Sequence, residues 1–320
     1  MFRLKLAVLI ATLLSAGALP ARGEVSVLPP DVVASDTVAV IRADAAHFNP
    51  DKLQAAMTAL LGDDAKGIKE MDEPMKKFKD LFNKATDAGI DAMTMVIGAP
   101  KKDDPDGRRG NGVLYITLKP DADVKAVETL LTEKLAERGD KREIVFDQTD
   151  NYLAMHTKKQ EFPVKPDAAR QAIFADALKT LGDSSIQLAF IPDADGRSKL
   201  LHSADDAPDR QKDIRPLLAK SSWMALAIDL GTSPQITASA NAATESDAKA
   251  MSDGIKADLD DVKAQTTKPG PMILMAPLIQ KVIDGLKITQ AQTRVSVSIN
   301  VESLKLIADF ADSMGAFDER

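Results

Sequence analysis

The sequence predicts an α+β protein built as a tandem pseudo-repeat of β-α-β-β-α-β-α units, with antiparallel sheets and helices packed on one face. Three observations support this prediction. Several segments alternate strictly between apolar and polar residues, other segments repeat apolar residues every three or four positions, and one short motif recurs in both halves of the chain.

The alternating segments are predicted to be strands. In residues 294–301, Val295, Val297, Ile299 and Val301 alternate with polar residues. One apolar side and one polar side are typical of an antiparallel sheet that is covered on one face. Similar patterns predict strands at 37–42, 93–98, 113–119, 143–147, 152–157, 186–191, 223–230 and 235–240.

Two helical segments carry the recurring motif. Asp-Val-Lys-Ala at 123–126 matches Asp-Ala-Lys-Ala at 247–250, and apolar residues follow each motif at the same offsets. Each helix comes directly after a predicted hairpin, so the same order of elements occurs at 37–182 and at 185–316. We therefore expect a first α+β domain at 24–183 and a second at 184–320. Two unrelated α+β domains that merely look alike are the alternative.

The first residues have the zones of a signal peptide. Arg3 and Lys5 precede the apolar run 6–14, and small residues around Pro20 follow it. An uncleaved membrane anchor is the alternative, but the apolar run is shorter than the ~20 residues that a spanning helix needs. We predict that residues 1–23 are removed and that the protein is periplasmic or extracellular. No later segment is apolar for long enough to span a membrane.

Charge and cysteine content exclude several classes of protein. Removal of residues 1–23 takes away three basic and no acidic residues, so the net charge of −7 becomes −10. This balance argues against a nucleic-acid partner, which requires clustered Lys and Arg. The chain has no Cys, which excludes a lipid anchor on a lipobox cysteine as well as disulfides and cysteine-ligated zinc.

The start of the predicted mature chain resembles a known group of sequences. Leu-Pro-Pro-Asp at 28–31, followed by Val-Ala-Val-Ile-Arg-Ala-Asp at 38–44, is similar to the start of uncharacterised bacterial exported proteins. They share the Trp-containing strand seen here at Trp223 and a repeated α+β layout. The resemblance implies an architecture, with no known activity and no functional residue to transfer.

Motifs for catalysis, cofactors and metals are weak or absent. The chain has no Gly-x-Ser-x-Gly, and His47, His156 and His202 each lack a second His at zinc-helix spacing. Two Asp-x-Asp-Gly loops, ending at Gly107 and Gly196, lack the further ligands of a calcium loop and are typical of turns. We therefore expect no cofactor, no metal and no catalytic residue that the sequence identifies.

The long loop at 101–112 is the most distinctive segment. It separates two predicted hairpin strands, and it is either a mobile tip or a contact site. As a contact site it would use Asp104, Asp106, Arg108 and Arg109.

The predicted function is therefore a broad one. We expect an exported non-catalytic binding or scaffold protein of the cell envelope or extracellular space, with an unknown protein or small molecule as its partner. A cleft between the halves is the expected ligand site. A secreted or periplasmic hydrolase with a carboxylate-based site and an assembly protein are the alternatives, so enzyme activity stays an open question.

Overall fold

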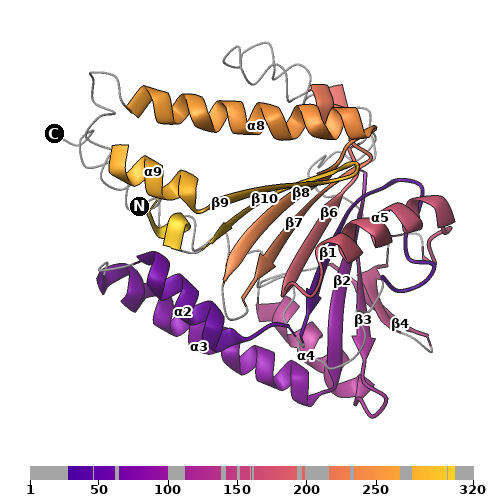
Figure 1. The fold of residues 1–320 in the computed structure, drawn as a ribbon. Helices are drawn as coiled ribbons and strands as arrows, with labels where there is room; N and C mark the ends of the chain where they lie inside the picture. The colour runs from indigo at the N-terminus through magenta and orange to yellow at the C-terminus, as the bar shows by residue number, and fades with distance from the viewer. Residues whose placement is uncertain are drawn as a thin grey trace.

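The computed structural model describes residues 28–45, 47–61, 65–99, 112–137, 142–149, 152–158, 160, 162–192, 197–198, 216–230, 234–266, 276–300 and 302–306. They form one antiparallel sheet of ten strands in the order β4-β5-β3-β2-β1-β6-β7-β8-β10-β9, with helices on both faces (Figure 1). The chain is therefore an α+β protein with a single large sheet.

Strands and helices are interspersed along the chain, in runs of one to three elements of the same kind. The strands are β1 (Thr37–Asp44), β2 (Ile90–Gly98), β3 (Gly112–Leu118), β4 (Ile144–Gln148), β5 (Leu153–Thr157), β6 (Ile186–Phe190), β7 (Trp223–Asp229), β8 (Gln235–Asn241), β9 (Leu286–Ala291) and β10 (Arg294–Asn300). The main helices are α2 (Pro50–Leu61), α3 (Ala65–Asp87), α4 (Val124–Glu137), α5 (Ala168–Thr180), α8 (Glu245–Thr266) and α9 (Ala276–Asp284).

The centre of the sheet is the pair formed by β1 and β6. Their antiparallel register runs from Ala39 opposite Phe190 to Ala43 opposite Ile186. Outward from this pair, the strand order is β1-β2-β3-β5-β4 on one side and β6-β7-β8-β10-β9 on the other. The expectation of separate sheets is corrected: pairing at the centre satisfies backbone groups that would otherwise lie open at two sheet edges.

All nine predicted strands are present, but the predicted order lacks one strand. The structure places two strands, β9 and β10, after α8 and α9, and β9 is absent from the prediction. Only Leu286 and Ile288 supply its apolar alternation, and β9 is an edge strand with exposed polar residues. Its pattern is therefore weaker than that of the central strands.

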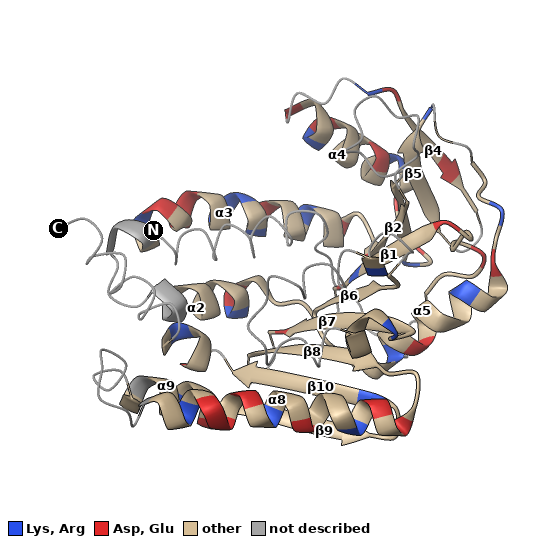
Figure 2. Ribbon diagram, turned by 90° about the horizontal axis from the view of Figure 1, so that it is seen from above, with Lys and Arg blue, Asp and Glu red and all other residues tan. Residues whose placement is uncertain are grey.

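The prediction of helices on one face is also corrected, because α5 lies on the face opposite the other main helices (Figure 2). On this "α5 face", Phe174 and Leu178 pack against Val40 and Ala189. The other face, here the "α8 face", is covered by α2 with α3, by α4 and by α8. The central strands are apolar on both faces, so both must be covered.

No helix within the described part of the chain is long and apolar enough to cross a membrane.

Candidate functional site

A cavity of about 420 Å³ lies on the α8 face of the second half of the sheet. Its floor consists of two parallel rows of side chains that cross four neighbouring strands. The strand registers place Phe190, Met224, Ala240 and Val295 in the first row, and Leu188, Leu226, Ala238 and Val297 in the second. The cavity is therefore built on β6, β7, β8 and β10.

Helix α8 covers the first row. Thr244 caps its start, because the Thr244 hydroxyl accepts a hydrogen bond from the backbone N–H of Asp247 at 3.0 Å. Ala248, Met251 and Ile255 then follow at helical spacing and pack toward Ala240 and Val295. Met251 and Ile255, together with Leu218 from a short helix at 216–219, complete the walls of the cavity.

No helix in the described part of the chain covers the second row in this way. Leu188, Leu226 and Val297 are partly exposed, Ala238 is exposed, and none of the four belongs to a packed core cluster of the described residues. The next row along the strands is packed again, because Ile186, Ile228 and Ile236 contact the cluster formed by α2 and α3. The second row is thus a bare apolar strip between two packed layers.

The chemistry of the cavity is apolar. Ala225 and Ser239 also border it, but strand alternation directs their side chains to the α5 face. The Ser239 hydroxyl accordingly lies 2.8 Å from the Ser296 hydroxyl on that face. Among the described residues, every side chain that faces the cavity is therefore Ala, Val, Leu, Ile, Met or Phe. These side chains suit an apolar ligand and carry no group for acid–base chemistry.

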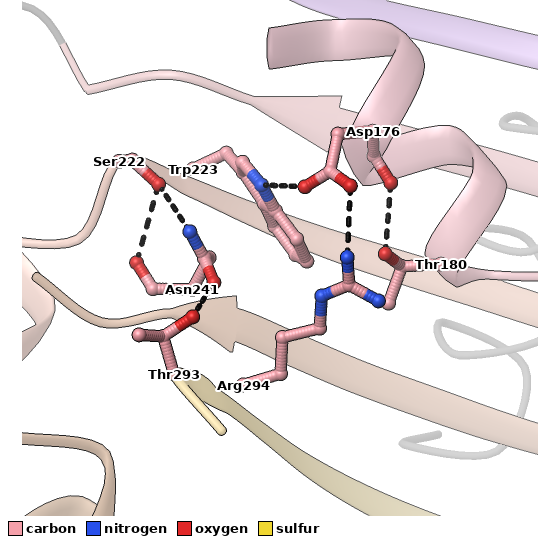
Figure 3. A network of polar contacts seen from close by, with 7 residues as sticks. All are labelled: Asp176, Thr180, Ser222, Trp223, Asn241, Thr293 and Arg294. Atoms are coloured by element: carbon pink, nitrogen blue, oxygen red, sulfur yellow. Dashed lines mark hydrogen bonds and ion pairs between the residues drawn. The ribbon is translucent and has the colours of Figure 1, made fainter. Parts of the chain in front are cut away.

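The α5 face behind the cavity carries a polar network (Figure 3). One Asp176 oxygen accepts a hydrogen bond from the Trp223 indole N–H at 3.1 Å, and the other accepts one from Arg294 at 2.8 Å. Beside it, the Asn241 amide donates to Ser222 at 2.8 Å and accepts from the Thr293 hydroxyl at 2.7 Å. Asp176 therefore links α5 to β7 and β10, and Asn241 links β8 to the residues that precede these two strands.

A charged cluster lies on the central strands. Arg42 and Asp44 form a buried ion pair at 2.6 Å, and the Arg42 side chain is only 4% exposed. Burial raises the pKa of Asp91 above its ordinary value, and the nearby Asp44 carboxylate raises it further. Since Asp44 is held by Arg42, this arrangement is an ion pair with a neighbouring acid, and neither carboxylate lines either of the two pockets that we describe.

The second pocket, of about 200 Å³, lies near the ends of β1 and β3 and is lined by Thr37, Val113 and Tyr115 among others. The Tyr115 hydroxyl is buried without a hydrogen-bond partner among the described residues, and burial raises its pKa. Because this hydroxyl is sealed from solvent, a ligand in the pocket could not reach it without a rearrangement. We therefore place the candidate site at the larger cavity.

The site residues named from the sequence are not among the described residues. Asp104, Asp106, Arg108 and Arg109 lie outside the described residues, as does His202. His156 is buried, stacks on Phe162 and contacts Asp147 at 2.6 Å. Across the described ranges, no three His, Cys, Asp or Glu side chains come together as a metal site requires.

The cavity residues were not predicted as a site. A strand with inward alanines, Ala238 and Ala240, is the signal that the sequence offered, since small residues leave space beneath a covering helix. Trp223 itself is core and is 1% exposed, whereas Met224 and Leu226 of the same strand face the cavity on the other side.

Comparison with known proteins adds little to this picture. No protein-family model matches the chain, and no curated protein matches it. One similar solved structure is described as "Structure of crystal form I of TP0453". It shares 11% identity over 89% of this chain and 99% of that chain, with a TM-score of 0.33. At that TM-score the likeness supports no conclusion about fold or function.

Proposed function

We propose that this chain is an exported, non-catalytic binding protein of the cell envelope or extracellular space, and that it holds an apolar small molecule in the cavity between α8 and the second half of the sheet. The observation that carries this proposal is the cavity of about 420 Å³, in which all the described side chains that face it are apolar. Its volume falls within the range typical of small-molecule sites, roughly 300–1,000 Å³.

The proposed architecture is a duplicated one. The outward strand orders β1-β2-β3-β5-β4 and β6-β7-β8-β10-β9 correspond position by position, and α4 and α8 each follow the third strand of their half. These correspondences support two related halves, of which the second has opened a cavity.

Export is the second part of the proposal. It is supported by the basic residues, the apolar run and the small residues of positions 1–23. N-terminal sequencing of the protein from its native host should find a mature chain that begins between 19 and 24, and an intact Met1 would contradict export by cleavage.

Ligand binding is tested with a neutral apolar dye, N-phenylnaphthylamine, whose fluorescence rises when it leaves water. We expect saturable binding, and at a hundredfold excess over its Kd the dye should stabilise the protein by about 2.7 kcal/mol in a thermal melt. Ala238→Leu, which fills the middle of the cavity floor, should abolish this binding.

A matched control is Thr289→Leu, which adds the same side chain at an exposed position of β9. Register with Ser296 places Thr289 on the α5 face, away from the cavity. Equal dye binding by wild type and Ala238→Leu would place the dye elsewhere and overturn the proposed site.

A further inference from the structure

We propose that the occupant of the cavity is one unbranched alkyl chain that lies across β6, β7, β8 and β10, roughly perpendicular to the strands. This inference rests on the proposed function and names the ligand class of the same site. It is carried by the shape of the floor, by the two packed layers beside it and by its open end.

The floor is elongated. It crosses four adjacent strands, which at about 4.8 Å between neighbours gives a length of roughly 14 Å. Its width is two rows on one face of the strands, which at ~3.4 Å per residue separates the rows by roughly 7 Å. A surface twice as long as it is wide matches a rod-shaped molecule.

Packed layers limit the width on both long sides. Met251 and Ile255 of α8 pack over the first row, and the third row, with Ile228 and Ile236, is packed against α2 and α3. A rigid fused-ring molecule broader than the bare strip would have to displace one of these layers. A flexible chain would not, and the unbranched Met224 and Met251 side chains can adjust to its path.

One end of the floor reaches the edge of the sheet. On β9, the second row continues with Ile288 opposite Val297, and the first row ends with Gln290 opposite Val295. Gln290 is exposed, whereas the described side chains that face the cavity itself are all apolar. A polar headgroup therefore has its place at the β9 edge, with the alkyl chain directed inward toward Leu188 on β6.

The first experiment measures displacement of N-phenylnaphthylamine from the full-length protein by octanoate, decanoate, dodecanoate and tetradecanoate. Affinity should rise about fourfold for each methylene that enters the cavity, which corresponds to about 0.8 kcal/mol. The increment should vanish once the chain is longer than the floor. Cholate, a rigid fused-ring carboxylate, should compete much more weakly than dodecanoate.

Two variants locate the chain. Ala238→Leu, in the middle of the floor, should weaken the binding of every chain, measured directly by titration calorimetry because this variant is expected to hold no dye. Leu188→Trp, at the inner end, should remove the gain of the longest chains and leave octanoate unchanged. Thr289→Leu again serves as the control on the opposite face. If Leu188→Trp fails to fold, the chain-length series and Ala238→Leu still decide the question.

An experiment with vesicles tests whether the alkyl chain belongs to a phospholipid or to a free fatty acid. After incubation with phosphatidylglycerol vesicles and re-isolation of the protein, mass spectrometry distinguishes a bound phospholipid from the free fatty acids of the first experiment. A chain from either source supports the inference. Binding of the dye without chain-length dependence, or stronger competition by cholate, would overturn the alkyl-chain inference and leave the proposed function standing. Absence of dye binding would overturn both.

Discussion

The same row of the sheet is filled on one side of the molecule and bare on the other. Outward from the central pair, the first half carries Met95, Leu114, Met155 and Phe146. Leu114 belongs to the core cluster beneath α4, and the other three pack against that cluster. At the matching positions, the second half carries Leu226, Ala238, Val297 and Ile288, and none of these belongs to a core cluster of the described residues.

The difference is one of side-chain volume as well as of cover. Leu226 and its counterpart Met95 are similar in size, but at the three further steps outward the second half has the smaller residue. The difference is clearest at Ala238, whose counterpart on the third strand of the first half is Leu114. Interiors are close-packed, so a smaller side chain beneath a helix leaves space unless the helix moves inward. The comparison therefore shows how one sheet can provide a packed core and a cavity.

The largest expected effect is a difference in unfolding free energy between alanine substitutions at two leucines of this row. Leu114→Ala should lower the free energy of unfolding by about 2–5 kcal/mol, because Leu114 is buried under α4 and its loss leaves a new void. Leu226→Ala should cost only about 1 kcal/mol, since Leu226 is partly exposed and already borders empty space.

Urea unfolding of both variants checks this difference. The wild type and Thr289→Leu provide the reference slopes, since a changed slope would signal a changed denatured state rather than lost packing. Equal losses for the two variants would mean that the second half is as tightly packed as the first.

The next effect concerns the network that ties α5 to the second half. Asp176→Ala should destabilise the protein by about 1–3 kcal/mol, because the indole N–H of the buried Trp223 loses its partner. Arg294→Gln is the matched control. Both side chains of the Arg294–Asp176 ion pair are more than 40% exposed, so its loss should cost at most about 1 kcal/mol. A larger loss of unfolding free energy for Arg294→Gln than for Asp176→Ala in the same urea titration would mean that the ion pair, and not the hydrogen bond to Trp223, contributes most of the stability.

The comparison can also be tested by enlarging side chains, at one alanine of the packed core and one of the cavity floor. Ala154→Leu should destabilise by about 1–3 kcal/mol, because Ala154 is fully buried in the cluster under α5 and a larger side chain overpacks it. Ala238→Leu should be neutral or slightly stabilising, because the cavity has room for the added atoms. Thermal melts of the ligand-free variants measure both, and a comparable loss for Ala238→Leu would show that the cavity is closed.

Much of the fold was predictable from the sequence. The strands with strict alternation, such as β10, and the helices with apolar residues every three or four positions, such as α8, are confirmed, because their signals are local. Central pairing of β1 with β6 was not predictable, because it joins residues about 150 positions apart. The position of α5 on the opposite face was missed for a related reason: its cluster assembles from both halves.

The candidate site was not predictable from local patterns. An apolar cavity has no motif, since Leu188, Leu226 and Val297 look like ordinary core residues in their strands. That these residues border empty space follows only from the register across four strands and from the position of α8 over the sheet. Reactive chemistry, in contrast, leaves motifs among polar and acidic residues, such as those of the loop at 101–112.

The smallest expected effect concerns charge, in which the two halves also differ. The α5 face of the second half carries neutral hydroxyl pairs, such as Thr237 with Ser298 at 2.9 Å, whereas the first half carries Asp91 near Asp44 and Arg42. Because burial and Asp44 raise the pKa of Asp91, the folded state binds more protons than the unfolded state between the ordinary and the raised value. The contribution of this group to stability is therefore lost as the pH rises through that window.

Asp91→Asn removes the titration. At neutral pH the variant should be slightly more stable than wild type. This advantage should shrink at a pH below the ordinary aspartate pKa, because the wild-type carboxyl is already neutral there. Urea unfolding at both pH values measures the change, and Asp260→Asn, an exposed position of α8, serves as the surface control. If the advantage of Asp91→Asn were greater at acidic pH, Asp91 would be stabilised as a carboxylate by Arg42 and Lys119. The charged cluster of the first half would then support the fold in its ionised form.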